Sequence, residues 1–205
     1  MEITKGLSNN NKGLVADLFL NALGEKFTPI LGDKIRAKQL LESSIHPNNC
    51  FSATTDTELL GILAFQINDT NFLSITFNKI ISVYGLINGI IKAIGLSLLV
   101  HNSSSDEIYL EAIAVCESAR GKRVGTQLIE ALFLFAKENN FKSITLQVID
   151  INPNAKKLYE RMGFVVVKRT RIWPINLIIK FPFKEVFLMK KEIYTGFHKY
   201  LRISS

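Results

Sequence analysis

Seven residues between a strand-like run and a helix-like run are the part of this sequence best suited to chemistry, Arg120-Gly121-Lys122-Arg123-Val124-Gly125-Thr126. Residues 108–115 are mostly apolar and contain β-branched side chains, which predicts a strand, and apolar residues recur at helical spacing over residues 126–139. At the start of such a helix, the unpaired N–H groups, the helix dipole and three cationic side chains all favour an anion. Glycine at 121 and 125 lets a ligand approach the backbone closely. The loop is therefore predicted to bind phosphate.

The loop matches neither of two common phosphate-binding patterns. A Walker loop requires Gly-x-x-x-x-Gly-Lys-Ser/Thr and a dinucleotide fingerprint requires Gly-x-Gly-x-x-Gly, and the sequence contains neither string. A second motif follows the next strand-like run, residues 143–148, and reads NPNAKKLYERMGF over residues 152–164. Asn152 or Asn154 can cap a short helix there and Gly163 can end it, after which a strand is expected to begin.

Together the two motifs resemble the GNAT superfamily of N-acetyltransferases. The family's acyl-CoA pyrophosphate loop is written Gln/Arg-x-x-Gly-x-Gly/Ala; Arg120 and Gly125 fit it, and Arg123 stands where the first glycine is usual. Residues 152–164 match the family's Asn-x-x-Ala-x-x-Leu-Tyr-x-x-x-Gly-Phe segment at every fixed position. The resemblance is close over residues 106–172 and elsewhere extends only to the order of elements. It implies an α/β (α+β) fold: a mixed, mostly antiparallel, twisted sheet flanked by helices and split between its fourth and fifth strands, where acetyl-CoA inserts.

The resemblance also implies a reaction and a set of site residues. The reaction is acetyl-CoA-dependent N-acetylation of a primary amine by direct transfer. Tyr159 is implied as the general acid for the departing thiolate; the alternative is an aromatic ring that only packs on its helix. Backbone N–H groups of residues 113–115 would bind the pantetheine arm and polarise the thioester. The expected cofactor-binding residues are Ile113, Ala114, Val115, Arg120, Gly121, Lys122, Arg123, Val124, Gly125, Thr126, Asn152 and Tyr159. No metal site is expected.

Glu111 is the candidate base. It is a carboxylate on an otherwise apolar strand, and a charge is costly to bury without a purpose. Two other interpretations stay open: Glu111 lies near an edge or a splayed region and is solvated, or it pairs with a lysine or arginine.

Arg123 replaces the glycine that is usual in the loop. The backbone donors survive the substitution provided that this position is helical, where arginine is well tolerated. The guanidinium would then strengthen phosphate binding.

Composition predicts a single domain over residues 1–205, with residues 106–172 as its cofactor-binding core. The first residues lack the apolar core of a signal peptide, and two cysteines without metal or redox spacing fit a reducing compartment, so a cytoplasmic location is expected. Residues 1–105 contain eight Lys/Arg and eight Asp/Glu, whereas residues 106–205 contain 17 and ten. The net charge of +7 thus lies in the half with the phosphate loop, which suits coenzyme A. No nucleic-acid partner is expected, because no nucleic-acid-binding signature occurs.

Two apolar segments lie outside the motifs. Residues 80–100 contain a single charge, Lys92, which together with Asn88 and three glycines argues against stable membrane insertion. We expect a buried or lid helix there, with an interfacial membrane contact as the alternative. Residues 72–105 and 173–184 are predicted to be acceptor-side inserts that form an apolar wall, and a homodimer surface on the first of them stays open.

The front half is expected to begin with helices, over residues 14–23 and 34–42, followed by strands at 50–54 and 59–65; a last strand is expected at 186–189. The acceptor stays open between a small-molecule and a peptide amine, because the fold and donor site are shared across acceptors. A rival function is a non-catalytic acyl-CoA sensor or interaction module, at a membrane through residues 80–100.

Overall fold

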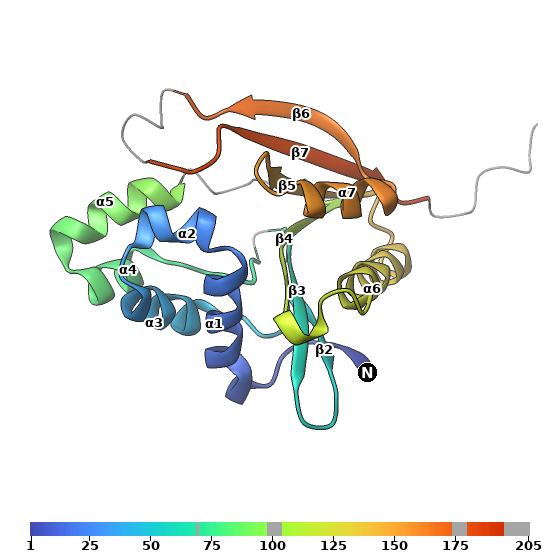
Figure 1. Cartoon of the computed structure of the whole chain (residues 1–205), viewed down its shortest axis with the longest axis horizontal. Coiled ribbons are helices and arrows are strands. Elements are labelled where there is room, and N and C mark those ends of the chain that lie inside the picture. The colour runs from blue at the N-terminus through green and yellow to red at the C-terminus, as the bar shows by residue number, and fades with distance from the viewer. Residues whose placement is uncertain (69, 98–103, 174–179, 195–205) are drawn as a thin grey trace, which may run out of the picture.

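A seven-stranded sheet with the order β1-β2-β3-β4-β5-β7-β6 forms the centre of the computed structural model (Figure 1). The structure describes residues 1–68, 70–97, 104–173 and 180–194. The strands are β1 (Glu2–Lys5), β2 (Cys50–Thr54), β3 (Leu59–Ile67), β4 (Glu107–Val115), β5 (Ser143–Ile149), β6 (Val165–Arg171) and β7 (Glu185–Glu192). Neighbouring strands are antiparallel except β4 and β5, which run parallel. The mixed, mostly antiparallel sheet that the sequence predicted is confirmed.

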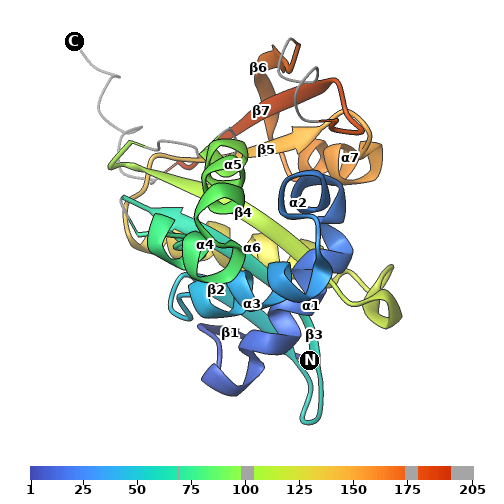
Figure 2. The same cartoon turned by 90° about the vertical axis from the view of Figure 1, so that its left-hand side faces the viewer.

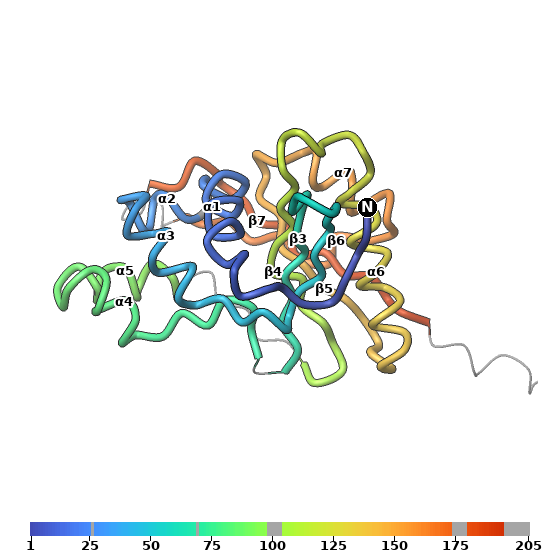
Figure 3. Tube along the Cα trace, turned by 90° about the horizontal axis from the view of Figure 1, so that it is seen from below, coloured from blue at the N-terminus to red at the C-terminus, as the bar shows by residue number. Residues whose placement is uncertain are grey.

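Helices cover both faces of this sheet. They are α1 (Lys12–Ala22), α2 (Gly24–Leu31), α3 (Lys34–Ser44), α4 (Phe77–Tyr84), α5 (Leu86–Ser97), α6 (Val124–Glu138) and α7 (Pro153–Arg161), with short 3-10 turns at Asn9–Asn11 and Glu117–Ala119. Alternate residues of β3 serve the two faces: Ile62 and Ala64 pack in the core with α1 to α4, and Leu63 and Phe65 pack with α6. In Figure 3, α1 to α5 accordingly lie on one side of the strands and α6 on the other.

Two N-terminal elements differ from the expectation. The front half begins with a strand, β1, which pairs with β2 at the sheet edge, and not with a helix. A further helix, α2, contains Pro29 and ends at Gly32, whose φ of +71° lies in the left-handed region. The segment is short and contains a proline and a glycine, so its hydrophobic periodicity did not predict a helix.

The apolar segment 80–100 is not one buried helix. Helix α4 ends at Gly85, whose φ of +75° breaks the helix, and α5 begins at the next residue. The two helices cross closely at Gly89, where an added Cβ would lie 3.3 Å from the Cα of Ile81. Gly89 and Gly95 are buried, but much of α5 is exposed. Residues 98–100 lie outside the described residues.

A β-bulge at Glu111 opens the centre of the sheet. Ala64 pairs with Ala112 and Phe65 pairs with Leu110, so Glu111 is the extra residue of β4. Pairing between β4 and β5 runs from Glu107 to Leu110 on the β4 side and stops there. The predicted split between the fourth and fifth strands is therefore present, and it begins at the bulge.

Gly61 lies where β3, β4 and the start of α6 approach one another. An added Cβ would lie 3.0 Å from the carbonyl oxygen of Ala114 and 3.2 Å from Cγ1 of Val124. We predict that Gly61→Ala lowers the free energy of unfolding by about 1–3 kcal/mol, because backbone in a packed core yields little. Urea unfolding measures the change.

Gly125→Ala is the matched control. An added Cβ on Gly125 would lie an ordinary 3.8 Å from the Val115 side chain, which also lies near Gly61. Gly125 is inside a helix, where alanine is favoured. The stability of this variant should stay equal to or above that of the wild type, and an equal loss in both variants would contradict the close approach at Gly61.

Candidate functional site

A cavity occupies the split between β4 and β5. It is bounded by β4, β5, α7 and the junction of α1 with α2, and Figure 2 shows α2 and α7 at the same end of the sheet. Its lining residues are Ala22, Leu23, Glu25, Leu110, Glu111, Ala112, Ile113, Gln147, Val148, Ile149, Asn152, Ala155 and Tyr159. The structure thus brings together four predicted site residues that lie up to 48 positions apart, Glu111, Ile113, Asn152 and Tyr159.

Sequence reasoning missed the contributions of α1, α2 and β5 to this cavity. Gln147 gave a signal that could have been used, because it alternates with Thr145 as a polar position on an apolar strand. Glu25 and Leu23 gave none, since their place follows from the packing of α2.

Glu111 is held by the backbone of the segment that follows β3. Its Oε1 accepts a hydrogen bond from the Phe72 N–H at 3.0 Å, and its Oε2 accepts one from the Leu73 N–H at 3.4 Å. Loss of solvation raises the pKa of Glu111 to about 7, and the two N–H donors offset only part of that rise. Glu111 is therefore not simply solvated, no described cation pairs with it, and its raised pKa places its ionisation near neutral pH.

Tyr159 lies on α7 with its ring packed edge-on against Phe164, at a centroid distance of 5.9 Å. The side chain is 8% exposed, and burial raises the pKa of Tyr159 to about 12. Its hydroxyl therefore keeps its proton at ordinary pH. Packing and a cavity position coexist here, so the two interpretations of Tyr159 do not exclude each other.

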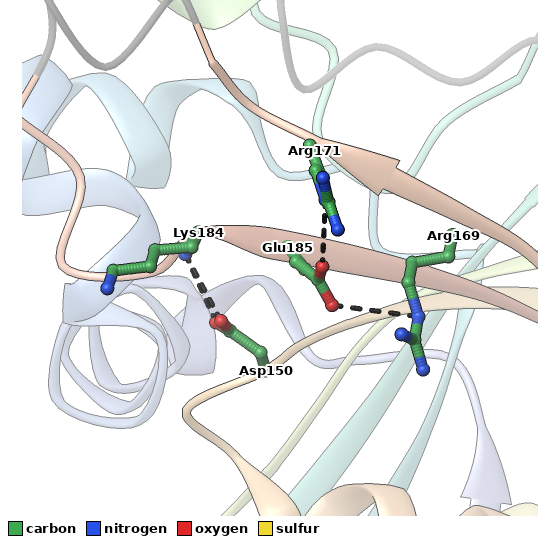
Figure 4. Close-up of polar contacts among 5 residues, drawn as sticks. All are labelled: Asp150, Arg169, Arg171, Lys184 and Glu185. Carbon is green, nitrogen blue, oxygen red and sulfur yellow. Dashed lines mark hydrogen bonds and ion pairs between the residues drawn. The ribbon is translucent and has the colours of Figure 1, made fainter.

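The caps of helix α7 and the turn before it fix the position of this helix. Asn152 Oδ1 accepts a hydrogen bond from the Ala155 N–H at 3.1 Å, and Gly163 ends the helix with a φ of +86°, as the motif predicted. Asp150, at the end of β5, accepts a hydrogen bond from the Lys184 N–H at 3.3 Å (Figure 4). Its own N–H donates to the Glu185 carbonyl at 3.1 Å. The turn that carries Asn152 is therefore fastened to β7.

The same close-up shows how Glu185 joins β7 to the edge strand. Its carboxylate lies 3.6 Å from Nε of Arg169 and 3.3 Å from Nε of Arg171, both on β6 (Figure 4). Both arginine side chains are largely exposed, so these pairs contribute little to stability.

The basic loop does not meet the condition stated for Arg123. Arg123 is not helical: it is the N-cap residue of α6 with φ +63° and ψ +13°, a left-handed conformation that glycine adopts freely. This explains the glycine that is usual at that position. Helix α6 begins at Val124, two residues earlier than predicted, and the Val124 side chain is buried. Only the backbone of Val124 can therefore face a ligand.

The loop has the features that coenzyme A requires. Gly121 has a φ of +77°, and an added Cβ would find no atom within 4 Å, so the loop is open to solvent there. Arg120, Lys122 and Arg123 are exposed. The first N–H groups of α6 have no partner within the helix, and the edge of β4 beyond Leu110 is unpaired with β5. These residues fit an acyl-CoA: anion donors at one end and an open strand edge leading to the cavity.

Comparison with known proteins identifies the family. Residues 17–164 match the sequence profile described as Acetyltransferase (GNAT) family, and the chain belongs to that family. The N-acetyltransferase of Staphylococcus aureus Mu50 has a similar structure, with a TM-score of 0.66 and 16% identity over 93% of this chain and 100% of that one. The ribosomal-protein-S18-alanine N-acetyltransferase of Escherichia coli gives a TM-score of 0.58 and 15% identity over 97% of each chain. At these identities the likeness shows the fold.

Curated relatives match over shorter stretches. The "Probable N-acetyltransferase camello" of Xenopus laevis is 36% identical over 61 residues, which are 30% of this chain and 28% of the relative. Streptothricin acetyltransferase A of Bacillus subtilis (strain 168) is 39% identical over 57 residues, 28% of this chain and 33% of the relative. The chain thus matches about a third or less of the length of these relatives.

The left-handed Arg123 has a measurable cost. We predict that Arg123→Gly raises the free energy of unfolding by about 1 kcal/mol, because glycine removes the clash of Cβ with the backbone at positive φ. Chemical denaturation measures this. Lys122→Gly is the control: Lys122 has a negative φ, so glycine there should lower stability. A loss of stability in both variants would show that Arg123 is not strained.

Proposed function

We propose that this chain is an acetyl-CoA-dependent N-acetyltransferase that moves an acetyl group to a primary amine of a small molecule or peptide by direct transfer. The observation that carries the proposal is the continuity of one site: a basic loop at the start of α6, an unpaired edge of β4, and a cavity containing Glu111 and Tyr159. Membership of the GNAT family supports the same class of reaction.

The donor side consists mainly of backbone. The N–H groups of Val124, Gly125 and Thr126, aided by the exposed Arg120, Lys122 and Arg123, would hold the phosphates. Main-chain groups of Ile113, Ala114 and Val115 would hold the pantetheine arm along the open edge of β4. The Ala114 side chain is buried, so its part is also limited to the backbone. When bound, acetyl-CoA supplies an acetyl group activated as a thioester.

Glu111 and Tyr159 can take opposite roles because, although burial raises both pKa values, Glu111 still ionises near neutral pH and Tyr159 stays protonated. Each Glu111 oxygen accepts one N–H bond and keeps a second lone pair, so the ionised carboxylate can take a proton from an acceptor ammonium. The neutral Tyr159 hydroxyl can give a proton to the departing thiolate. A base with a pKa near 7 and an acid that stays protonated are the pair that this reaction needs at neutral pH.

The acceptor would enter from the side of α1 and α2. Among the described side chains, the cavity lining includes the carboxylates of Glu25 and Glu111 and no lysine or arginine, which favours a cationic amine. Residues 72–105 reach the site through the backbone of Phe72 and Leu73, and we keep this segment and residues 173–184 as the proposed acceptor-side inserts. Residues 98–103 and 174–179, which belong to these two segments, lie outside the described residues.

The first test is calorimetric titration with acetyl-CoA. We predict one-to-one binding in the micromolar range, weakened at least about tenfold by Gly125→Glu, because a carboxylate at the start of α6 opposes the phosphates. Leu134→Glu adds the same charge at an exposed position near the other end of the same helix and should bind as the wild type does. Absence of binding to the wild type would overturn the proposal, and binding without thiol release across an amine screen would favour the acyl-CoA sensor.

The second test is the pH dependence of kcat/KM, measured by thiol release. Glu111 must be ionised to act as base, and its raised pKa means that activity should climb with pH through about 7. Glu111→Gln should remove this limb and lower kcat/KM by about 10²–10⁴-fold. Two acceptors whose amine pKa values differ identify the group: a limb that moves with the acceptor, or persists in Glu111→Gln, belongs to the amine and contradicts the assignment.

A further inference from the structure

The outer face of α5 is an exposed apolar surface with no role in the site. Leu86, Ile87, Ile90, Ile91 and Ile94 are 62%, 77%, 45%, 61% and 62% exposed. At 100° per residue these five positions fall on one side of the helix, and we call this side the α5 face. Figure 2 shows α5 in front of the sheet, at the surface. Large apolar side chains gathered in this way mark an interaction surface.

The charges around the α5 face are predominantly positive. Helices α4 and α5 contain two charged residues, Lys79 and Lys92, and no carboxylate. Lys92 Nζ lies near the junction of α2 and α3, because a Cβ added to Gly32 would be 3.7 Å from it. Lys34 and Arg36, which follow this junction, are exposed. The neighbouring carboxylate, Asp33, accepts a hydrogen bond from the Arg36 N–H at 2.8 Å as a helix cap. The surroundings therefore complement an anionic partner.

The composition of the face distinguishes a lipid surface from a protein partner. Protein interfaces concentrate their binding energy in Trp, Tyr and Arg and surround it with hydrogen-bonding groups. The five large apolar side chains of the α5 face are all leucine or isoleucine. Aliphatic residues on a surface helix next to lysines are typical of helices that lie in the plane of a membrane, with the apolar side about 5–10 Å below the headgroups. Among the described residues, no helix is both long and apolar enough to cross a bilayer.

We propose that the α5 face binds the surface of membranes that contain anionic lipids, with α5 lying in the membrane plane. Five aliphatic side chains enter the headgroup boundary, and nearby basic residues of α3 and α5 approach the lipid phosphates and carboxylates. The proposal is independent of the acetyltransferase activity, because the five residues do not line the catalytic cavity.

The test is co-sedimentation of the full chain with vesicles of phosphatidylcholine, alone or mixed with phosphatidylserine. The wild type should bind the mixed vesicles more strongly, and less so at high salt. The double variant Ile87→Glu with Ile91→Glu should lower the partition coefficient by at least about tenfold, because two carboxylates replace buried apolar side chains. Both positions are exposed, so the variant should fold, which circular dichroism checks.

Leu134→Glu is the matched control. Leu134 is 63% exposed on α6, on the other side of the sheet from α5, and this variant should partition as the wild type does (Figures 1 and 3). No vesicle binding by the wild type, or equal binding by the double variant, would overturn the proposal. Light scattering after gel filtration tests whether a second copy of the chain binds the α5 face instead. If the wild type binds no vesicles but forms a dimer that the double variant does not form, the α5 face is a dimer interface.

Discussion

The extra residue in β4 is the constraint on which the rest of the site depends. Before Glu111, Ile108 and Leu110 face the core beneath α6; after it, Ala112 and Ala114 face the core beneath α1 to α4. One bulged residue therefore reverses the two faces of the strand without interrupting either core. The pairing of β4 with β5 also stops at this bulge, and the Glu111 carboxylate lines the cavity between the two strands. A regular β4 would keep the sheet closed, and the cavity would not exist.

The basic loop shows a second compromise, between backbone geometry and charge. The turn into α6 requires a left-handed residue, and Arg123 adopts that conformation at a cost that glycine would avoid. In return the chain places one more exposed cation beside the helix N-terminus. At the surface such a charge contributes modestly and depends on salt, so strain and attraction are of similar size. Gly121, at φ +77°, keeps the loop open while Arg123 bends it.

Local signals explain which parts of this fold were predictable. The segment 152–164 encodes its own cap, buried face and stop, so helix α7 and the position of Tyr159 followed from a few neighbouring residues. Strands with apolar runs, such as β3 at Leu59–Ile67, were also visible. The bulge was not, because an inserted residue changes which partner each residue faces and leaves the apolar pattern intact. Likewise, the conformation of Arg123 depends on how the turn joins α6, and the exposure of α5 depends on what else packs nearby.

Glu111 connects the cavity to the helices that carry the α5 face. Its two hydrogen bonds hold the backbone of Phe72 and Leu73, and the chain enters α4 at Phe77, a few residues later. Bonds to an ionised carboxylate are stronger than bonds to a neutral one, and the pKa of about 7 places the change between the two within the range of working pH. The protonation state of Glu111 therefore affects the strength of the two hydrogen bonds that join β4 to the segment before α4. Helix α4 in turn crosses α5 closely at Gly89, so a continuous series of contacts runs from Glu111 to the helix that carries the α5 face.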